Sequence, residues 1–212
     1  MQKQNYSIIL EETIKKNEKA GIRPTLLLHA CCAPCSSYVL EYLSKSFDIT
    51  LLFYNPNISP EEEYIFRKNE LIRLTNEMPL PTKIEVITEE YDASEFYSMA
   101  NGLEDLPEGG ERCKKCYRLR LARAAEIAKR LGFDYFTTTL SISPYKNAEW
   151  LNTIGCEEGE ARGVKYLFSD FKKKNGYKRS CELSEEYRLY RQNYCGCEFS
   201  KKAAEAKSRT TL

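Results

Sequence analysis

The 212-residue sequence lacks a long apolar run, a large net charge and any low-complexity tract. No segment approaches the roughly 18 consecutive apolar residues that a membrane-spanning helix needs, and the first residues do not resemble a secretory signal. We therefore expect a cytoplasmic protein with no membrane partner. The 32 basic and 31 acidic side chains give a net charge of +1, which excludes nucleic-acid binding through an overall basic surface.

Histidine is also scarce, because His29 is the single histidine in a chain with nine cysteines. A chain of this size in a reducing compartment does not need disulfides, so grouped cysteines are more often metal ligands or redox groups. We expect such chemistry from three cysteine groups, and not from the isolated Cys156 and Cys181. The groups are Cys31, Cys32 and Cys35; Cys113 and Cys116; and Cys195 and Cys197.

Strand and helix patterns alternate along the first two thirds of the chain. Apolar and β-branched runs predict strands over residues 25–29, 49–54, 83–87 and 134–140. Helical patterns follow them over residues 36–45, 60–76, 92–101 and 113–131. This order predicts an α/β fold with an open, mostly parallel sheet and flanking helices.

Length and composition predict a single domain over residues 1–200. Towards its end we expect a short helix over residues 184–192, which Ser184 would cap. The remaining residues, 201–212, are rich in charge and are expected to form a frayed tail.

In an open parallel sheet, ligands collect at the carboxyl ends of the strands. Those ends carry Cys31 and Cys32, residues 54–57 and residues 141–147, so we expect one site there. The first cysteine group lies in a turn between a strand and a helix that begins near Ser36. The amino terminus of that helix favours thiolates or a bound anion.

The cysteine spacing leaves the type of site open. Four thiolates bind either zinc or an iron-sulfur cluster, and adjacent cysteines such as Cys31 and Cys32 suit a multi-atom cluster or two metal sites better than a single chelate. The segment from Cys32 to Cys35 also matches the thioredoxin-like redox motif, although the distant cysteine pairs argue against it.

The other two groups have their own geometry. Cys113 and Cys116 are three residues apart on a predicted helix and share one face. Cys195 and Cys197 flank a glycine, so they either form a strained, easily reduced disulfide or ligate the metal.

A local basic patch is predicted despite the neutral whole. Residues 112–130 contain eight lysines and arginines against one glutamate, Glu126. Together with the lysines near residue 173, they could contact phosphates, while Tyr117 and Tyr177 could stack on bases. The alternative is that this charged helix face is simply solvated.

Five motifs, in this order, resemble the QueH epoxyqueuosine reductases, and the resemblance runs from about Thr25 to Ser200. They are Leu28-His29-Ala30-Cys31-Cys32-Ala33-Pro34-Cys35, Tyr54-Asn55-Pro56-Asn57-Ile58, Arg112-Cys113-Lys114-Lys115-Cys116-Tyr117, the stretch from Thr137 to Asn147, and Tyr190-Arg191-Gln192-Asn193-Tyr194-Cys195-Gly196-Cys197.

The resemblance implies a reductase that converts epoxyqueuosine to queuosine at the wobble position of tRNA without cobalamin. It also implies a fold similar to the adenine nucleotide α-hydrolase-like proteins. Among the residues, it implies a 4Fe-4S cluster on Cys31, Cys32, Cys113 and Cys116, and a redox-active pair at Cys195 and Cys197. Cys35 competes for a ligand position, and an additional mononuclear iron at Cys35 is an open alternative.

Three points stay open at this stage. The external electron donor is unidentified, and the candidate proton donors are Tyr54, Tyr145 and His29. Two other functions fit the cysteine pattern without the resemblance: a zinc-stabilised, non-catalytic tRNA-binding module, and a thiol-disulfide oxidoreductase that acts on proteins.

Overall fold

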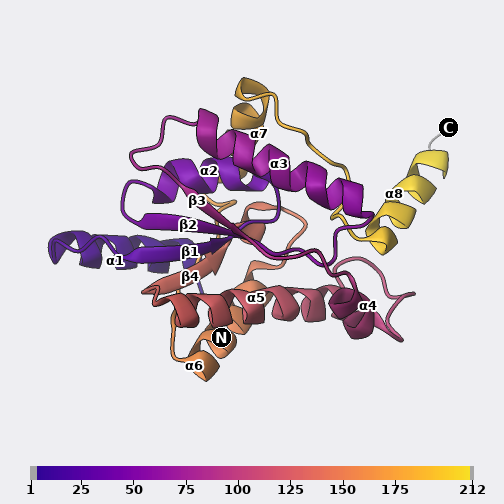
Figure 1. The fold of residues 1–212 in the computed structure, drawn as a ribbon, viewed down its shortest axis with the longest axis horizontal. Coiled ribbons are helices and arrows are strands. Elements are labelled where there is room, and N and C mark those ends of the chain that lie inside the picture. The colour runs from indigo at the N-terminus through magenta and orange to yellow at the C-terminus, as the bar shows by residue number, and fades with distance from the viewer. Residues whose placement is uncertain (1–3, 211–212) are drawn as a thin grey trace.

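The computed structural model describes residues 4–210 and contains an open five-stranded sheet in the order β3-β2-β1-β4-β5, with every strand pair parallel (Figure 1). The strands are β1 (Thr25–His29), β2 (Asp48–Phe53), β3 (Glu85–Thr88), β4 (Tyr135–Thr138) and β5 (Lys165–Tyr166). The predicted α/β fold with a parallel sheet is confirmed. Its strand order is compatible with the adenine nucleotide α-hydrolase-like arrangement.

Helices cover both faces of the sheet (Figure 1). On one face lie α2 (Ala33–Leu43) and α3 (Glu61–Glu77), with α7 (Gly176–Glu186) packed on α2. The opposite face carries α5 (Glu111–Leu131) and α6 (Ala148–Arg162). The remaining helices are α1 (Tyr6–Lys19), α4 (Ser94–Ala100), the short 3-10 helix η1 (Thr139–Ile142) and α8 (Glu198–Thr210).

The central strand β1 shows why two helical layers are needed. Successive side chains of a strand point to opposite faces. Leu26 and Leu28 are fully buried in the core under α2 and α3, whereas Leu27 is fully buried in the core under α5 and α6. The apolar run of β1 is therefore continuous because both of its faces are covered.

The helix α5 leads the second cysteine group to the sheet edge. Its buried positions Leu121, Ala124, Ala125 and Ala128 recur at helical spacing and pack towards the sheet. Gly132 ends the helix with a φ of 76°, a left-handed conformation that glycine adopts without a steric penalty. These features confirm the helix that the sequence predicts there.

One prediction about the last third of the chain is wrong. Ser184 does not begin a helix over residues 184–192; it lies inside α7 and donates to the carbonyl of Ser180. The helix ends at Glu186, and Arg188 has a φ of 50°, which takes the chain out of the helical path. Residues 201–210, expected to fray, continue α8.

Other elements were not predicted at all, namely α1, α6 and β5. Residues 211–212 of the predicted tail lie outside the described residues, and the single domain over residues 1–200 stays a prediction. None of the helices within residues 4–210 combines the length and the apolar character that crossing a membrane requires.

We predict that the substitution Gly155→Ala destabilises the protein. A Cβ atom at Gly155, on α6, would lie 2.3 Å from a ring carbon of Tyr166 on β5. Overpacking of this kind costs about 1–3 kcal/mol, which is more than the ~1 kcal/mol that alanine gains over glycine inside a helix. Urea denaturation measures the change in the free energy of unfolding.

The control is the same substitution in a Tyr166→Val background, where the obstructing ring is gone. There, Gly155→Ala is expected to be neutral or stabilising, because the helix propensity of alanine is no longer opposed. An equal loss of stability in both backgrounds would show that the Tyr166 ring does not constrain this position.

Candidate functional site

The first cysteine group gathers where β1 turns into α2. Cys32 precedes the first residue of α2, and Pro34 lies in the first turn of that helix, which suits its missing N–H. The sulfur atoms of Cys31, Cys32 and Cys35 all lie within 4.8 Å of one another. We call these three residues the thiol triad.

The thiol triad shares negative charge. Hydrogen bonds from Cys31 and Cys35 hold the pKa of Cys32 well below its usual range, although burial opposes this. The same hydrogen bonds raise the pKa of the two donors: that of Cys31 rises to about 11 through its bond to Cys32, and that of Cys35 rises as well. One thiolate stabilised by two thiols is a donor set that a thiophilic metal can use, since thiolate is the ligand form of cysteine.

His29 lies at the end of β1 and joins neighbouring segments. Its Nδ1 atom is 2.9 Å from Oγ1 of Thr138, and its Nε2 atom is 3.0 Å from the carbonyl oxygen of Tyr54. Complete burial lowers the pKa of His29 to about 4. A neutral imidazole with both nitrogens engaged favours a structural role over that of a proton donor.

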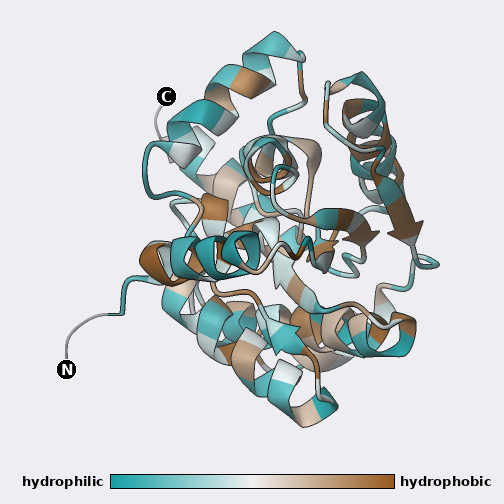
Figure 2. Cartoon of the chain, turned by 90° about the vertical axis from the view of Figure 1, so that its left-hand side faces the viewer, coloured by the Kyte–Doolittle hydropathy of each residue, from teal (hydrophilic) through white to brown (hydrophobic). Residues whose placement is uncertain are grey.

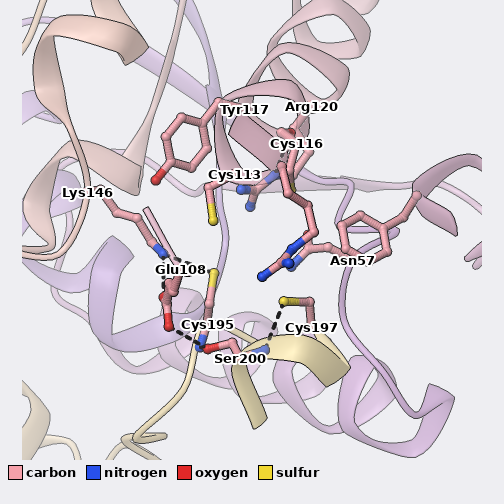
Figure 3. Close-up of a pocket in the computed structure, with 12 residues that line it drawn as sticks. Asn57, Glu108, Cys113, Cys116, Tyr117, Arg120, Lys146, Cys195, Cys197 and Ser200 are labelled. Atoms are coloured by element: carbon pink, nitrogen blue, oxygen red, sulfur yellow. Dashed lines mark hydrogen bonds and ion pairs between the residues drawn. The ribbon is translucent and has the colours of Figure 1, made fainter. Parts of the chain in front are cut away.

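The second and third cysteine groups line one pocket (Figure 3). Cys113 and Cys116 come from the first turns of α5, whereas Cys195 and Cys197 come from the segment that leads into α8. Cys116 and Cys197 are buried in a small apolar cluster with Phe96. We call the space lined by these four cysteines the thiol pocket.

A lysine inside the thiol pocket contacts the third group. Nζ of Lys146 donates to Sγ of Cys195 at 3.1 Å and to the carboxylate of Glu108 at 3.3 Å. Ser200 donates to the same carboxylate at 2.9 Å and accepts a hydrogen bond from the backbone N–H of Cys195 at 3.0 Å, so the contacts close into a ring (Figure 3). Three separate segments thus hold Cys195 and Lys146 together.

Lys146 keeps its charge in this pocket. Burial alone would lower its pKa, but Cys195, Tyr117 and Glu108 outweigh burial and raise it. An ammonium group at this distance stabilises a thiolate over a thiol. Sequence reasoning missed Lys146, although its position in the turn after β4 and η1, at the carboxyl edge of the sheet, is a signal that could have found it.

Two arginines are almost completely buried beside the cysteines. Arg67, on α3, pairs with Glu63 at 2.7 Å and donates to the carbonyl of Cys195 at 3.3 Å. Arg120, on α5, donates to the carbonyl of Cys116 at 3.3 Å. Within the described residues, the Nη2 atoms of both guanidinium groups have no hydrogen-bond partner.

These buried cations fit an anionic sulfur-bound group. A buried charge is costly unless an opposite charge compensates it. Seven cysteines belong to the thiol triad and the thiol pocket, and thiolates are the ligands of both structural zinc and iron-sulfur clusters. The residues present therefore fit a metal centre held by thiolates.

The structure divides the predicted ligand set. Cys31 and Cys32 lie with Cys35 in the thiol triad, while Cys113 and Cys116 line the thiol pocket with the predicted redox pair. Among residues 4–210, the group of sulfur atoms within 4.8 Å of one another contains Cys35 and neither cysteine of α5. All nine cysteines are free thiols, including Cys195 and Cys197.

The predicted basic patch is largely neutralised. Arg118 pairs with Glu157 and Glu158, and Arg123 pairs with Glu89 and Glu95. Arg112 and Arg120, from the same stretch, are buried. Tyr117 is buried and lines the thiol pocket, so its stacking on bases stays a prediction.

One aromatic side chain near the thiol pocket is open to solvent. Tyr145, the residue before Lys146, is 80% exposed. Of the other predicted proton donors, Tyr54 donates its hydroxyl hydrogen to Glu95. The isolated Cys156 contacts Glu160, and neither Cys156 nor Cys181 lines the thiol pocket.

Comparisons with known proteins agree on one family. The family model described as "Epoxyqueuosine reductase QueH" matches residues 26–203. A protein of Streptococcus pyogenes serotype M1 with that name is 44% identical over 203 residues, which cover 95% of this chain and 80% of that protein. One of Staphylococcus epidermidis is 43% identical, covering 94% and 85%, and one of Thermotoga maritima is 39% identical over 177 residues, covering 83% and 90%.

We predict that Lys146→Met slows the alkylation of Cys195 by iodoacetamide at neutral pH by about tenfold, because thiolate is the nucleophile and its charge partner is lost. Peptide mass spectrometry over time measures the rate, with Cys156 in the same sample as the internal reference. Lys146→Arg keeps the charge and should react nearly as the unchanged protein does.

The matched control is Lys172→Met, which removes a half-buried lysine that pairs with Asp170. It should leave the Cys195 rate unchanged. Equal rates for Lys146→Met and the unchanged protein would mean that the lysine does not activate this sulfur.

Proposed function

This chain belongs to the QueH epoxyqueuosine reductases, and we propose that it reduces epoxyqueuosine to queuosine at the wobble position of tRNA in the cytoplasm. The observation that carries the proposal is the thiol triad together with a pocket that is lined by four further thiols and three buried cations, Arg112, Arg120 and Lys146. A binding module needs neither the free cysteine pair nor a lysine aimed at one of its sulfurs.

The reaction removes the epoxide oxygen and leaves an alkene. Two carbon–oxygen bonds break, a carbon–carbon double bond forms, and two electrons with two protons convert the oxygen to water. Cys195 and Cys197 would supply the electrons by forming a disulfide. An external two-electron donor would then reduce that disulfide, and its identity is not part of the proposal.

The proton positions follow from the contacts in the thiol pocket. Burial and the neighbouring Cys195 raise the pKa of Cys197 to about 12, so Cys197 carries its proton at neutral pH. Sγ of Cys195 accepts a hydrogen bond from the ammonium of Lys146 and is the sulfur to which we assign the thiolate role. One proton from Cys197 and one from Lys146 complete the water, and the charges balance, because a thiolate and an ammonium are consumed together.

The proposed cluster ligands are those that the resemblance implies, namely Cys31, Cys32, Cys113 and Cys116, for a 4Fe-4S cluster. Cys35, whose sulfur lies with those of Cys31 and Cys32, is the candidate ligand for an additional mononuclear iron. When bound, such a group supplies electrons one at a time and a Lewis acid for the epoxide oxygen. The protein's own residues bind the substrate, exclude water and hold the protons.

The tRNA contact is proposed at the mouth of the thiol pocket instead of along α5. Tyr145 is exposed and precedes Lys146, which lines the pocket, while Lys114 follows the pocket-lining Cys113 and lies over the ring of Trp150 at 5.7 Å. Aromatic rings stack on unpaired bases of any sequence, and lysines contact the phosphates between them. An unpaired anticodon loop presents both groups to this surface.

The ligand assignment predicts that anaerobically purified protein is brown and that Cys113→Ala and Cys116→Ala each lose most of the chromophore and iron, because one of four anchors is missing. Iron and sulfide assays with absorption spectra measure this. Cys197→Ser should keep iron and colour but allow at most one turnover of epoxyqueuosine-containing tRNA, because the disulfide cannot form.

Cys156→Ala is the control and should behave as the unchanged protein. Full iron content in Cys113→Ala would show that Cys113 is not a ligand of the cluster. Loss of iron in Cys197→Ser would show that Cys197 is a ligand. Colourless protein that contains zinc and binds tRNA would replace the reductase proposal with the binding module.

For the tRNA contact, Tyr145→Ala is expected to weaken tRNA binding by about tenfold, because base–aromatic stacking contributes ~1–3 kcal/mol. Tyr145→Phe should retain the affinity. Binding is measured by fluorescence anisotropy at fixed salt. Tyr177→Ala, on α7, is the control and should have no effect; a similar loss in both alanine variants would contradict an interface at Tyr145.

A further inference from the structure

Arg120 is a buried cation without a carboxylate partner among the described residues. Its side chain is 1% exposed, and Nε donates to a carbonyl of its own helix, that of Cys116. The guanidinium carbon lies 5.9 Å from the centre of the Tyr117 ring. Nη2 has no hydrogen-bond partner among the described residues, although two of its hydrogens are available.

Carboxylates balance Arg123 and Arg67, whereas Arg120 has no such partner among the described residues. Arg123, one turn further along α5, contacts Glu89, Glu95 and Glu126, and Arg67 contacts Glu63. Within residues 4–210, Arg120 has no such ion pair. Because an uncompensated buried charge is expensive, its counter-charge must come from another kind of group.

Arg120 lines the thiol pocket together with Cys113, Cys116, Cys195 and Cys197, and these sulfurs would supply the counter-charge once a metal group holds them as thiolates. Burial would lower the pKa of Arg120, but Cys116, Cys195 and Cys31 outweigh it and raise the pKa. Cys31 belongs to the thiol triad, while Cys116 and Cys195 line the thiol pocket. Arg120 therefore lies in the field of both cysteine groups.

We propose that Arg120 is a positioning residue that holds the thiol triad and the thiol pocket together as one anionic centre and raises the reduction potential of the iron-sulfur group bound there. The proposal rests on the proposed function, since it needs that group to be present. A fixed cation in a medium of low dielectric constant stabilises the more negative, reduced form of a neighbouring redox group.

The test compares midpoint potentials, measured by anaerobic redox titration with electron paramagnetic resonance, of the unchanged protein and of Arg120→Met. We expect the reduced-to-oxidised ratio at a fixed potential to fall at least tenfold, which corresponds to 59 mV for one electron. Arg120→Lys keeps the charge and should retain most of the potential. The control is Arg123→Met, which removes a charge of the same helix. Because carboxylates already pair with Arg123, this substitution should leave the midpoint potential unchanged.

A role confined to folding would not produce this pattern. If Arg120→Met has the same midpoint potential as Arg123→Met, the proposal is overturned. It is also overturned if the midpoint potential of Arg120→Lys falls as far as that of Arg120→Met. Where the methionine variant does not accumulate, Arg120→Gln takes its place, because it is uncharged but keeps a planar polar group.

Iron content and thermal unfolding are measured on every variant. If the uncharged variants fold but bind no iron while Arg120→Lys binds iron, the charge of Arg120 is needed for assembly of the iron-sulfur group, which supports the proposal. If the uncharged variants fail to fold while Arg120→Lys folds, the proposal is overturned and Arg120 has a packing role. Absence of iron from the unchanged protein would contradict the proposed function. It would also overturn the proposal for Arg120, because there would be no iron-sulfur group whose reduction potential Arg120 could raise.

Discussion

The constraint on which the site depends is the burial of positive charge among sulfur atoms. Arg67, Arg120 and Lys146 are buried where three cysteine groups meet, and only Arg67 and Lys146 of these contact a carboxylate within the described residues. Such an arrangement is stable when the sulfurs carry negative charge. These buried cations therefore stabilise the thiolate forms that a metal group would need as ligands.

The sheet brings the sulfurs to that place. Parallel strands end at a common edge, so the turn after β1, the turn after β4 and η1, and the first turn of α5 face one another. The segment before α8 closes the arrangement from outside the sheet (Figure 1). In the view of Figure 2, polar residues coat the outer faces of the helices, while apolar residues concentrate on the strands.

The sequence was sufficient for the parts of the fold that depend on local patterns. The run from Thr25 to His29 and the helix from Cys113 to Leu131 were predicted from periodicity, and the thiol triad follows from one turn. Lys146 was missed because a lysine in a turn carries no periodic signal. The helix expected at Ser184 failed because tertiary packing on α2 fixes α7 eight residues earlier.

The segment from Cys195 to Cys197 is held to the body by contacts with side chains and loops, among them the bond from Lys146 to Cys195. The carbonyl of Cys195 accepts from Arg67, that of Gly196 accepts from the N–H of Ser59, and Ser200 bonds to Glu108. None of these contacts belongs to the sheet. Sub-global opening of this segment, which hydrogen exchange detects, would part the two halves of the thiol pocket and leave the thiol triad in place. The free energy of opening this segment is thus smaller than the free energy of unfolding the whole domain.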